Sequence, residues 1–123
     1  MIAEAVLCLA LNVYHEARGE PWDGRVAVAL VTRNRAERHG TSICWETFRE
    51  SQFSWTNDIR KLRTLPAGDK WDESLAVARA VAGGAADITS GATHYHTLGI
   101  RPRWAKSMIK IGVWGSHVFY RES

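Results

Sequence analysis

The sequence lacks cysteine pairs and long apolar runs. Its two cysteines, Cys8 and Cys44, lie far apart with no Cys-x-x-Cys motif, which indicates neither a disulfide scaffold nor a thiolate zinc site. We expect Cys8, which falls within an apolar helix, simply to be buried. No apolar run approaches the ~20 residues that a membrane span requires. We therefore expect no membrane insertion.

An export signal and internal repeats are missing as well. The first residues lack the basic region that precedes the apolar core of a secretory signal, and Glu4 and Asn12 interrupt the apolar stretch. We therefore expect the chain to be made in the host cytoplasm. No repeat, low-complexity tract or linker divides its 123 residues. Residues 1–123 are predicted to form one domain around one core, and we expect a monomer.

Charge and aromatic content favour an anionic or carbohydrate partner. The net charge is +3 and the pI is near 9.1, with Lys and Arg clustered at 33–38 and 60–63. Such a surface attracts polyanions, among them nucleic acid and anionic cell wall, although ordinary solvated helix faces are the alternative. The sequence contains six tryptophans, and sugar rings stack on indole faces, so this number favours a sugar ligand. The alternative is that the large aromatic side chains compensate for a small core.

Motifs for nucleotide or nucleic-acid binding are absent. The sequence contains no helix-turn-helix pattern, RNA-binding signature, phosphate-binding glycine loop or dinucleotide fingerprint. The segment 101–104 places two arginines beside Trp104, a combination that nucleic-acid-binding proteins also use. Taken alone, this segment is weak evidence for nucleic-acid binding. We expect no nucleic-acid partner.

Apolar spacing predicts an α+β fold that is mainly helical, with a small C-terminal β region. The expected helices span 2–17, 23–40, 42–48 and 69–83, with Asp23, Ser42 or Thr41, and Asp69 as caps. The periodicity disappears between 51 and 69, which predicts a long loop of the kind that is often functional. Alternation at 93–97 and a β-prone stretch at 118–120 predict two short strands.

Glu16 is the first candidate for chemistry. It falls in the last turn of an apolar helix, and Gly19 and Pro21 should end that helix and turn Glu20 away. A carboxyl at the end of an apolar helix loses solvent, which raises its pKa and makes it a general acid suited to protonating a glycosidic oxygen. The alternatives are a surface salt bridge with Arg18 or simply a charge at the end of a helix.

Three histidines form the second group of candidate functional residues. The strand period places His94 and His96 on one face, and His117 could join them from another strand. Three imidazoles suit Zn²⁺, so a metal-dependent amidase or peptidase is the competing hypothesis. The spacing matches no helix-borne zinc motif, and His beside Tyr95 is equally suited to binding sugar hydroxyls.

A possible saccharide subsite opens the long loop. Gln52, Phe53, Ser54 and Trp55 offer an amide, a hydroxyl and two aromatic faces in four residues. A hydrophobic plug between helices would explain Phe53 but not its polar neighbours.

Eight short segments, taken in order, resemble the SleB/CwlJ-type cell wall hydrolases of spore-cortex-lytic enzymes and phage endolysins. They are Asn12–Pro21, Val31–Arg35, Ile43–Cys44, Gln52–Trp55, Gly91–His96, Trp104–Ala105, Ile111–Gly112 and His117–Tyr120. Each segment is weak alone, but the ordered series is specific. The resemblance implies a lysozyme-like domain that cuts peptidoglycan between N-acetylmuramic acid and N-acetylglucosamine.

The resemblance also implies Glu16 as catalytic acid of a lytic transglycosylase, which forms a 1,6-anhydro end without a cofactor or metal. Gln52, Phe53, Ser54, Trp55, His94, Tyr95, His96, Trp104 and Tyr120 are the expected substrate-binding residues. Glu20 and His117 are secondary candidates, and Asp58 and Asp87 are possible second carboxylates by position. A lysin without its own export signal fits a phage enzyme that reaches the wall after the membrane is permeabilised.

Overall fold

A computed structural model describes residues 2–49 and 64–123 of the chain. The elements in order are α1 (Glu4–Ala17), α2 (Trp22–His39), α3 (Ile43–Phe48), α5 (Asp69–Ala82), β1 (His94–Thr97), the 3-10 helix η2 (Arg103–Ser107), β2 (Ile109–Trp114) and β3 (His117–Arg121). Helices come first and a small sheet last, so the predicted α+β, mainly helical class is confirmed. No described helix is both long and apolar enough to span a membrane.

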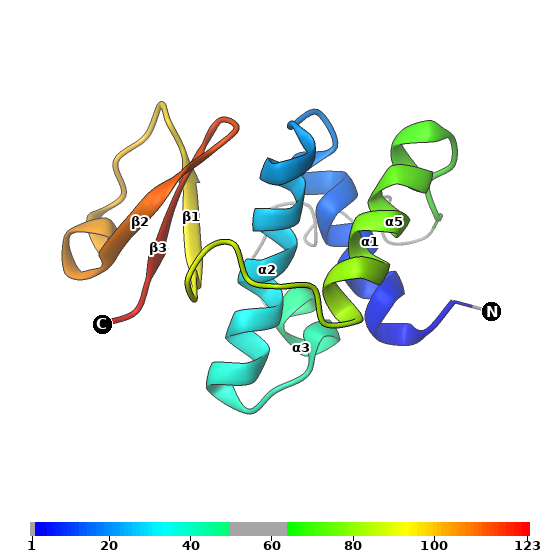
Figure 1. Ribbon diagram of the computed structural model, residues 1–123, viewed down its shortest axis with the longest axis horizontal. Helices are drawn as coiled ribbons and strands as arrows, with labels where there is room; N and C mark the ends of the chain where they lie inside the picture. Colours follow the sequence, from blue (N-terminus) through cyan, green and yellow to red (C-terminus); the bar gives the residue numbers. More distant parts are fainter. Residues whose placement is uncertain (1, 50–63) are drawn as a thin grey trace.

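The sheet stands at one end of the molecule, beside the helices (Figure 1). Its three strands are antiparallel in the order β1-β3-β2. Residue His94 pairs with Tyr120, Tyr95 with Phe119, and Thr97 with His117. Paired residues of neighbouring strands point to the same face, so this register decides which side chains meet the helices.

Helix α2 lies between the sheet and the pair α1 and α5 (Figure 1). Its Ala29 and Leu30 are buried in a core cluster with α1 and α5. Its Val28 and Val31 belong to a second cluster that contains Phe119 of β3. A helix buried on two sides does not carry a single apolar stripe. Helix α2 therefore joins both halves of the core and fixes the sheet relative to α1.

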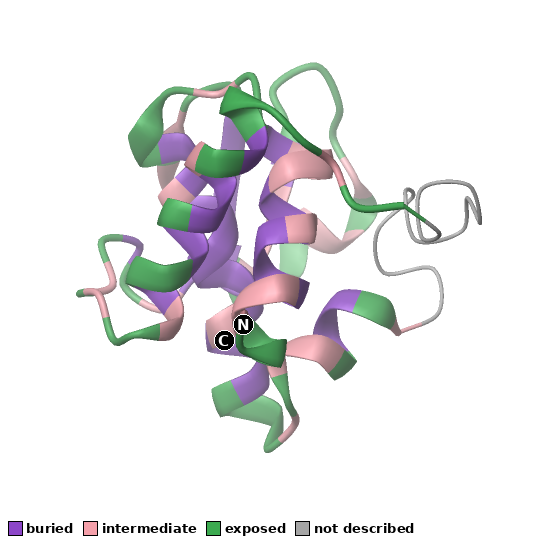
Figure 2. Cartoon of the chain, turned by 90° about the vertical axis from the view of Figure 1, so that its right-hand side faces the viewer, coloured by how far each residue is buried: buried purple, intermediate pink, exposed green. Residues whose placement is uncertain are grey.

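Burial follows the same arrangement. Figure 2 shows buried residues on the inward faces of the helices and exposed residues on their outer faces. Leu9 and Val13 of α1 are fully buried, as are Val77 and Val81 of α5. The regularly spaced apolar residues that predicted these two helices are thus the residues that pack the helices against each other.

Two of the predicted helix caps are wrong. The cap positions of α2 and α5 belong to Pro21 and Gly68, and no side chain caps either helix. Asp23 and Asp69 lie instead within the first turn, where their charge still interacts favourably with the helix dipole. Ser42 does cap α3, because its hydroxyl accepts a hydrogen bond of 2.9 Å from the backbone amide three residues later.

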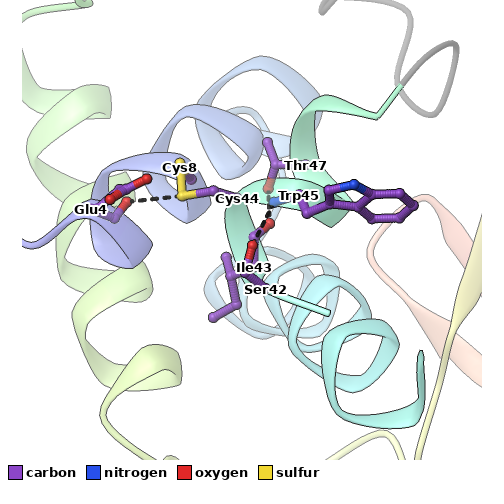
Figure 3. Close-up of a disulfide and its surroundings, with 7 residues drawn as sticks. All are labelled: Glu4, Cys8, Ser42, Ile43, Cys44, Trp45 and Thr47. Atoms are coloured by element: carbon purple, nitrogen blue, oxygen red, sulfur yellow. Dashed lines mark hydrogen bonds between the residues drawn. A yellow bond between two sulfur atoms is a disulfide. The ribbon is translucent and has the colours of Figure 1, made fainter. Parts of the chain in front are cut away.

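A disulfide joins α1 to α3, contrary to the expectation from the sequence. Cys8 and Cys44 are bonded, with their Cα atoms 5.2 Å apart and a separation of 36 positions along the chain (Figure 3). Cys8 is buried as predicted, but as one half of a bridge. Spacing alone gave no sign of the bond, because it depends on α1 and α3 lying side by side. Closing a loop of this length stabilises the fold by roughly 4 kcal/mol in the chain-entropy model.

Candidate active site

A carboxylate and a phenol meet where the end of α1 faces the sheet. Glu16, in the last turn of α1, is half-buried, and its Oε1 accepts a hydrogen bond of 3.1 Å from the Tyr95 hydroxyl of β1. Ala17, the next residue, is buried against Phe119 of β3 in the second core cluster. The packing of Ala17 therefore places Glu16 at the edge of the sheet.

Tyr95 is held by rings on its own face of the sheet. Its ring lies edge-on to His117, with the centroids 5.0 Å apart, and 5.5 Å from Phe119. Burial, and then the charge and hydrogen bond of Glu16, raise the pKa of Tyr95 well above its usual value of 10. The phenol therefore stays protonated near neutral pH and acts as a fixed hydrogen-bond donor to Glu16.

Arg18 does not form the predicted alternative pair with Glu16. Its Nη1 donates to the backbone oxygen of Tyr14 at 3.1 Å, and its guanidinium lies 4.7 Å from the centre of the Tyr14 ring. The arginine thus closes the end of α1 by binding the preceding turn of the helix.

Glu20 is bound to the turn between β2 and β3. Its Oε1 accepts hydrogen bonds from the Ser116 amide at 2.8 Å and the Ser116 hydroxyl at 2.6 Å, and it lies 3.0 Å from Nδ1 of His117. Burial alone raises the pKa of Glu20, but the bonds from Ser116 and the neighbouring His117 outweigh it, so the pKa is lowered. Glu20 is therefore an ionised anchor between the helices and the sheet.

Two glycines leave room for the Glu20 side chain. Gly115 has φ +62, and a Cβ atom there would lie 2.7 Å from Oε1 of Glu20. A Cβ on Gly24, in the first turn of α2, would approach the Glu20 side chain to 3.3 Å. Sequence reasoning named Glu20 and His117 but missed Ser116. The only available signal was the Gly-Ser pair between two β-prone stretches, which marks a turn but not its partner.

Within the described residues, the aromatic candidates other than Tyr95 lie on the other face of the sheet. His96 stacks on Tyr120, and its Nε2 is 2.8 Å from the Tyr120 hydroxyl. Trp104 of η2 contacts this pair and also His94, with ring centroids 5.2 to 5.7 Å apart. Successive strand residues point to opposite faces, so Tyr95 faces Glu16 while His94 and His96 face away. The structure thus divides those expected substrate-binding residues that it describes into two groups.

The strand register also contradicts the three-histidine grouping. His117 pairs with Thr97 and shares the face of Tyr95, so the sheet separates it from His94 and His96. The two ring nitrogens of His96 lie within 2.8 Å of the Tyr120 hydroxyl and the Thr97 carbonyl. Among residues 2–49 and 64–123, no group of three or more His, Cys, Asp or Glu could hold a metal ion. His94, His96 and His117 therefore do not form the zinc site that the competing hypothesis requires.

Asp87, a possible second carboxylate by position, organises the loop before β1. Its carboxylate accepts hydrogen bonds from Thr89, from the Gly91 amide and from Asn34 of α2, at 2.6 to 2.9 Å. Burial raises the pKa of Asp87, but these bonds outweigh it and lower the pKa. Asp58, the other candidate, lies outside the described residues, as do Gln52, Phe53, Ser54 and Trp55.

A buried carboxylate that the sequence gave no reason to select is Glu46 of α3. Its Oε2 accepts a hydrogen bond of 2.6 Å from the Thr41 hydroxyl and lies 3.2 Å from Nδ1 of His39. The second ring nitrogen of His39 is 3.3 Å from Glu122, near the end of the chain. This network links α2, α3 and the segment after β3, which is a structural role.

Comparisons with known proteins agree on one family. The family model described as Cell Wall Hydrolase matches residues 19–120. The catalytic domain of SleB from Bacillus cereus is 26% identical, with a TM-score of 0.72, and the match covers 98% of this chain and 93% of that one. The catalytic domain of the germination-specific lytic transglycosylase SleB from Bacillus anthracis is 24% identical, with a TM-score of 0.76 and coverages of 98% and 97%. No curated protein matches the chain.

These likenesses bear on the fold more than on single residues. The family match begins at residue 19 and so includes Glu20, Tyr95 and His117 but not Glu16. The structural matches extend over nearly the whole chain, which confirms the predicted SleB-type, lysozyme-like fold. The role of Glu16 therefore depends on the local geometry.

Proposed function

Since the chain belongs to the cell wall hydrolase family, we propose that it cuts the glycan strand of peptidoglycan between N-acetylmuramic acid and N-acetylglucosamine, with Glu16 as the acid. The observation that carries the proposal is the hydrogen bond from the Tyr95 hydroxyl to Glu16. It fixes a half-buried carboxyl at the end of an apolar helix, in a fold that matches a SleB catalytic domain. A fixed acid of this kind can protonate a glycosidic oxygen.

The reaction that fits best uses one carboxyl. Protonated Glu16 gives its proton to the leaving glycosidic oxygen, and the bond from that oxygen to the anomeric carbon breaks. The resulting carboxylate then accepts the proton of the muramic acid 6-hydroxyl as its oxygen attacks the anomeric carbon. The product carries a 1,6-anhydro end, and Glu16 regains its proton. Tyr95 takes part by donating a hydrogen bond to Oε1, which orients the carboxyl.

The bonding of Glu20 and Asp87, the second-carboxylate candidates that lie within the described residues, supports this one-acid scheme. A hydrolytic glycosidase of the usual type needs two carboxyls that flank the scissile bond. Glu20 is bound to Ser116 and His117, and Asp87 to Thr89 and Gly91. Both carboxylates are held in place by protein donors, so neither is suited to activating a water.

The test is digestion of purified peptidoglycan by the Glu16→Gln variant, followed by mass spectrometry of the products. We expect the wild-type chain to release fragments with anhydro ends and the variant to release none, with its circular dichroism spectrum unchanged. Glu37→Gln, at an exposed position of α2, is the matched control and should retain activity. Unchanged release of anhydro fragments by Glu16→Gln would refute the proposal. Products of the wild-type chain with reducing ends would show that it hydrolyses the bond and does not form the anhydro ring.

We also propose that the enzyme is a phage endolysin that acts as a monomer on the wall after the membrane has been permeabilised. The Cys8–Cys44 disulfide supports action outside the reducing cytoplasm, and the basic surface favours retention on anionic wall material. Expression of the chain in bacteria, with and without a membrane-permeabilising protein, tests this role. Lysis should require both proteins, and lysis by the chain alone would contradict the proposed route.

A further inference from the structure

The outer face of the sheet, away from Glu16, carries a hollow that the proposed reaction does not use. Its volume is about 440 Å³. His96, Val118 and Tyr120 of the sheet form its floor, and the connection from β1 to β2 forms its walls. All three floor residues are buried, so the base of the hollow is built from fixed core side chains. Figure 1 shows this connection on the side of the sheet that the helices do not cover.

The charge around the hollow has one sign. Arg101, Lys106 and Lys110 line it, and Arg103 lies in the same connection. Residues 98–116 contain these four cations and no Asp or Glu. In the described part of the chain, no ion pair involves any of the four. The hollow therefore offers cations whose charge is not neutralised by neighbouring acids, and an anionic ligand is the complement.

Apolar side chains stand beside the cations. Leu98 and Ile100 are 57% and 53% exposed, and Pro102 lies next to them in the lining. Tyr120 also lines the hollow. A bare phosphate would use the cations alone, whereas a small peptide with carboxylates and methyl groups would use both the charges and the apolar rim.

We propose that this hollow binds a short carboxylate-bearing peptide, the chemistry of the peptide stems attached to peptidoglycan glycan strands. The proposal rests on the proposed function, which supplies peptidoglycan as the substrate. The sheet separates the hollow from Glu16, so the bound stem lies apart from the sugars at the reacting bond. Binding a stem there holds the enzyme on the cross-linked wall between cuts and lowers its dissociation rate.

The test measures binding without any glycan. The probe is the N-acetylated tripeptide N-acetyl-L-alanyl-γ-D-glutamyl-L-lysine, whose acetyl group stands in for the amide link to the glycan, titrated into isotope-labelled Glu16→Gln protein and followed by NMR. We expect chemical shift changes within 96–120, and at least tenfold weaker binding of the same peptide with its carboxyls amidated. The double variant Lys106→Gln/Lys110→Gln should also bind at least tenfold more weakly. Arg79→Gln, at an exposed position of α5, is the matched control and should bind normally.

Three results would overturn the proposal. Equal binding of the acidic and amidated peptides would remove the role of charge. Full affinity in the double lysine variant would place the peptide elsewhere. Shifts caused only by inorganic phosphate, or only by vesicles of phosphatidylglycerol, would assign the hollow to a phosphate polymer or to a membrane surface.

The two proposals fail separately. Loss of peptide binding leaves the release of anhydro fragments by the wild-type protein untouched. Retained activity of Glu16→Gln would refute the catalytic assignment without altering the titration of the peptide.

Discussion

The Tyr95 hydroxyl lies 3.1 Å from Oε1 of Glu16, although the two residues are 79 positions apart along the chain. The phenol reaches the carboxylate because β1 pairs with β3, and Phe119 of β3 is buried against Ala17 at the end of α1. On the same face of the sheet, His117 lies between Tyr95 and Glu20. Two glutamates four residues apart thus contact the same face of the sheet with different tasks, one bonded to Tyr95 and the other to the β2–β3 turn.

The first prediction concerns Tyr95→Phe. A hydrogen bond to a charged group contributes about 1.5–3 kcal/mol, so its loss should lower kcat by about tenfold to a hundredfold. KM should change less, because the phenol acts through Glu16. Steady-state rates on soluble glycan fragments measure both constants. Tyr14→Phe, which removes a phenol from the same helix as Glu16, is the control; equal rates for wild type and Tyr95→Phe would contradict the orienting role.

The second prediction concerns the anchor formed by Glu20. Glu20→Ala should lower the free energy of unfolding by about 1–3 kcal/mol at pH 7, because Ser116 and His117 lose a charged acceptor. Since the folded state lowers the pKa of Glu20, this contribution is present above its ordinary value of 4.5 and is lost as the pH falls through the folded value. Urea unfolding at pH 7 and pH 3 should show the difference shrinking in acid.

The control for this prediction is Glu37→Ala, an exposed glutamate of α2, which should change the stability little at either pH. Gly115→Ala is an independent check, since its Cβ would meet Glu20 at 2.7 Å and occupy a left-handed conformation. It should destabilise the protein, and less so in a Glu20→Ala background, because part of the clash is then gone. Additive effects of the two changes would contradict the contact.

The third prediction concerns the disulfide. Replacing Cys8 and Cys44 by serine should lower the free energy of unfolding by about 2–4 kcal/mol, through a denatured state that is no longer restrained. Wild-type protein in dithiothreitol should match the variant, and reductant should not change the stability of the variant. Mass spectrometry after alkylation reports whether the bond has formed. Free thiols in protein purified under oxidising conditions would contradict the bond.

The fourth prediction concerns pH and His94. Burial, and then the positive charge of Arg35, lower the pKa of His94 from 6.5 to about 4. Between these values the unfolded chain binds a proton that the folded chain does not, so stability falls as the pH drops from about 6.5 to about 4. His94→Gln should reduce that fall, measured as the urea midpoint at pH 7 and pH 4.5. An unchanged slope in the variant would show that His94 is not the responsible group.

Several features were predictable from the sequence because they are encoded locally. The apolar spacing predicted α1 and α5, the alternation at 93–97 predicted β1, and Ser42 was correctly included among the possible caps of α3. Asp23 and Asp69 failed as caps because each falls one or two positions inside its helix, an offset that propensity does not resolve. Glu16 and Tyr95 were both named, but as separate candidates with no contact between them.

By itself, then, the sequence determined the main helices, two of the three strands, the family resemblance and the alternation that puts His94 and His96 on one face; it gave no sign of β2. Only the tertiary structure decided that Tyr95 meets Glu16, that His117 lies across the sheet from His94, and that Cys8 bonds to Cys44. The reason is physical. Helical and strand periods depend on neighbours a few residues apart, whereas strand register and helix packing depend on which distant apolar surfaces are buried together.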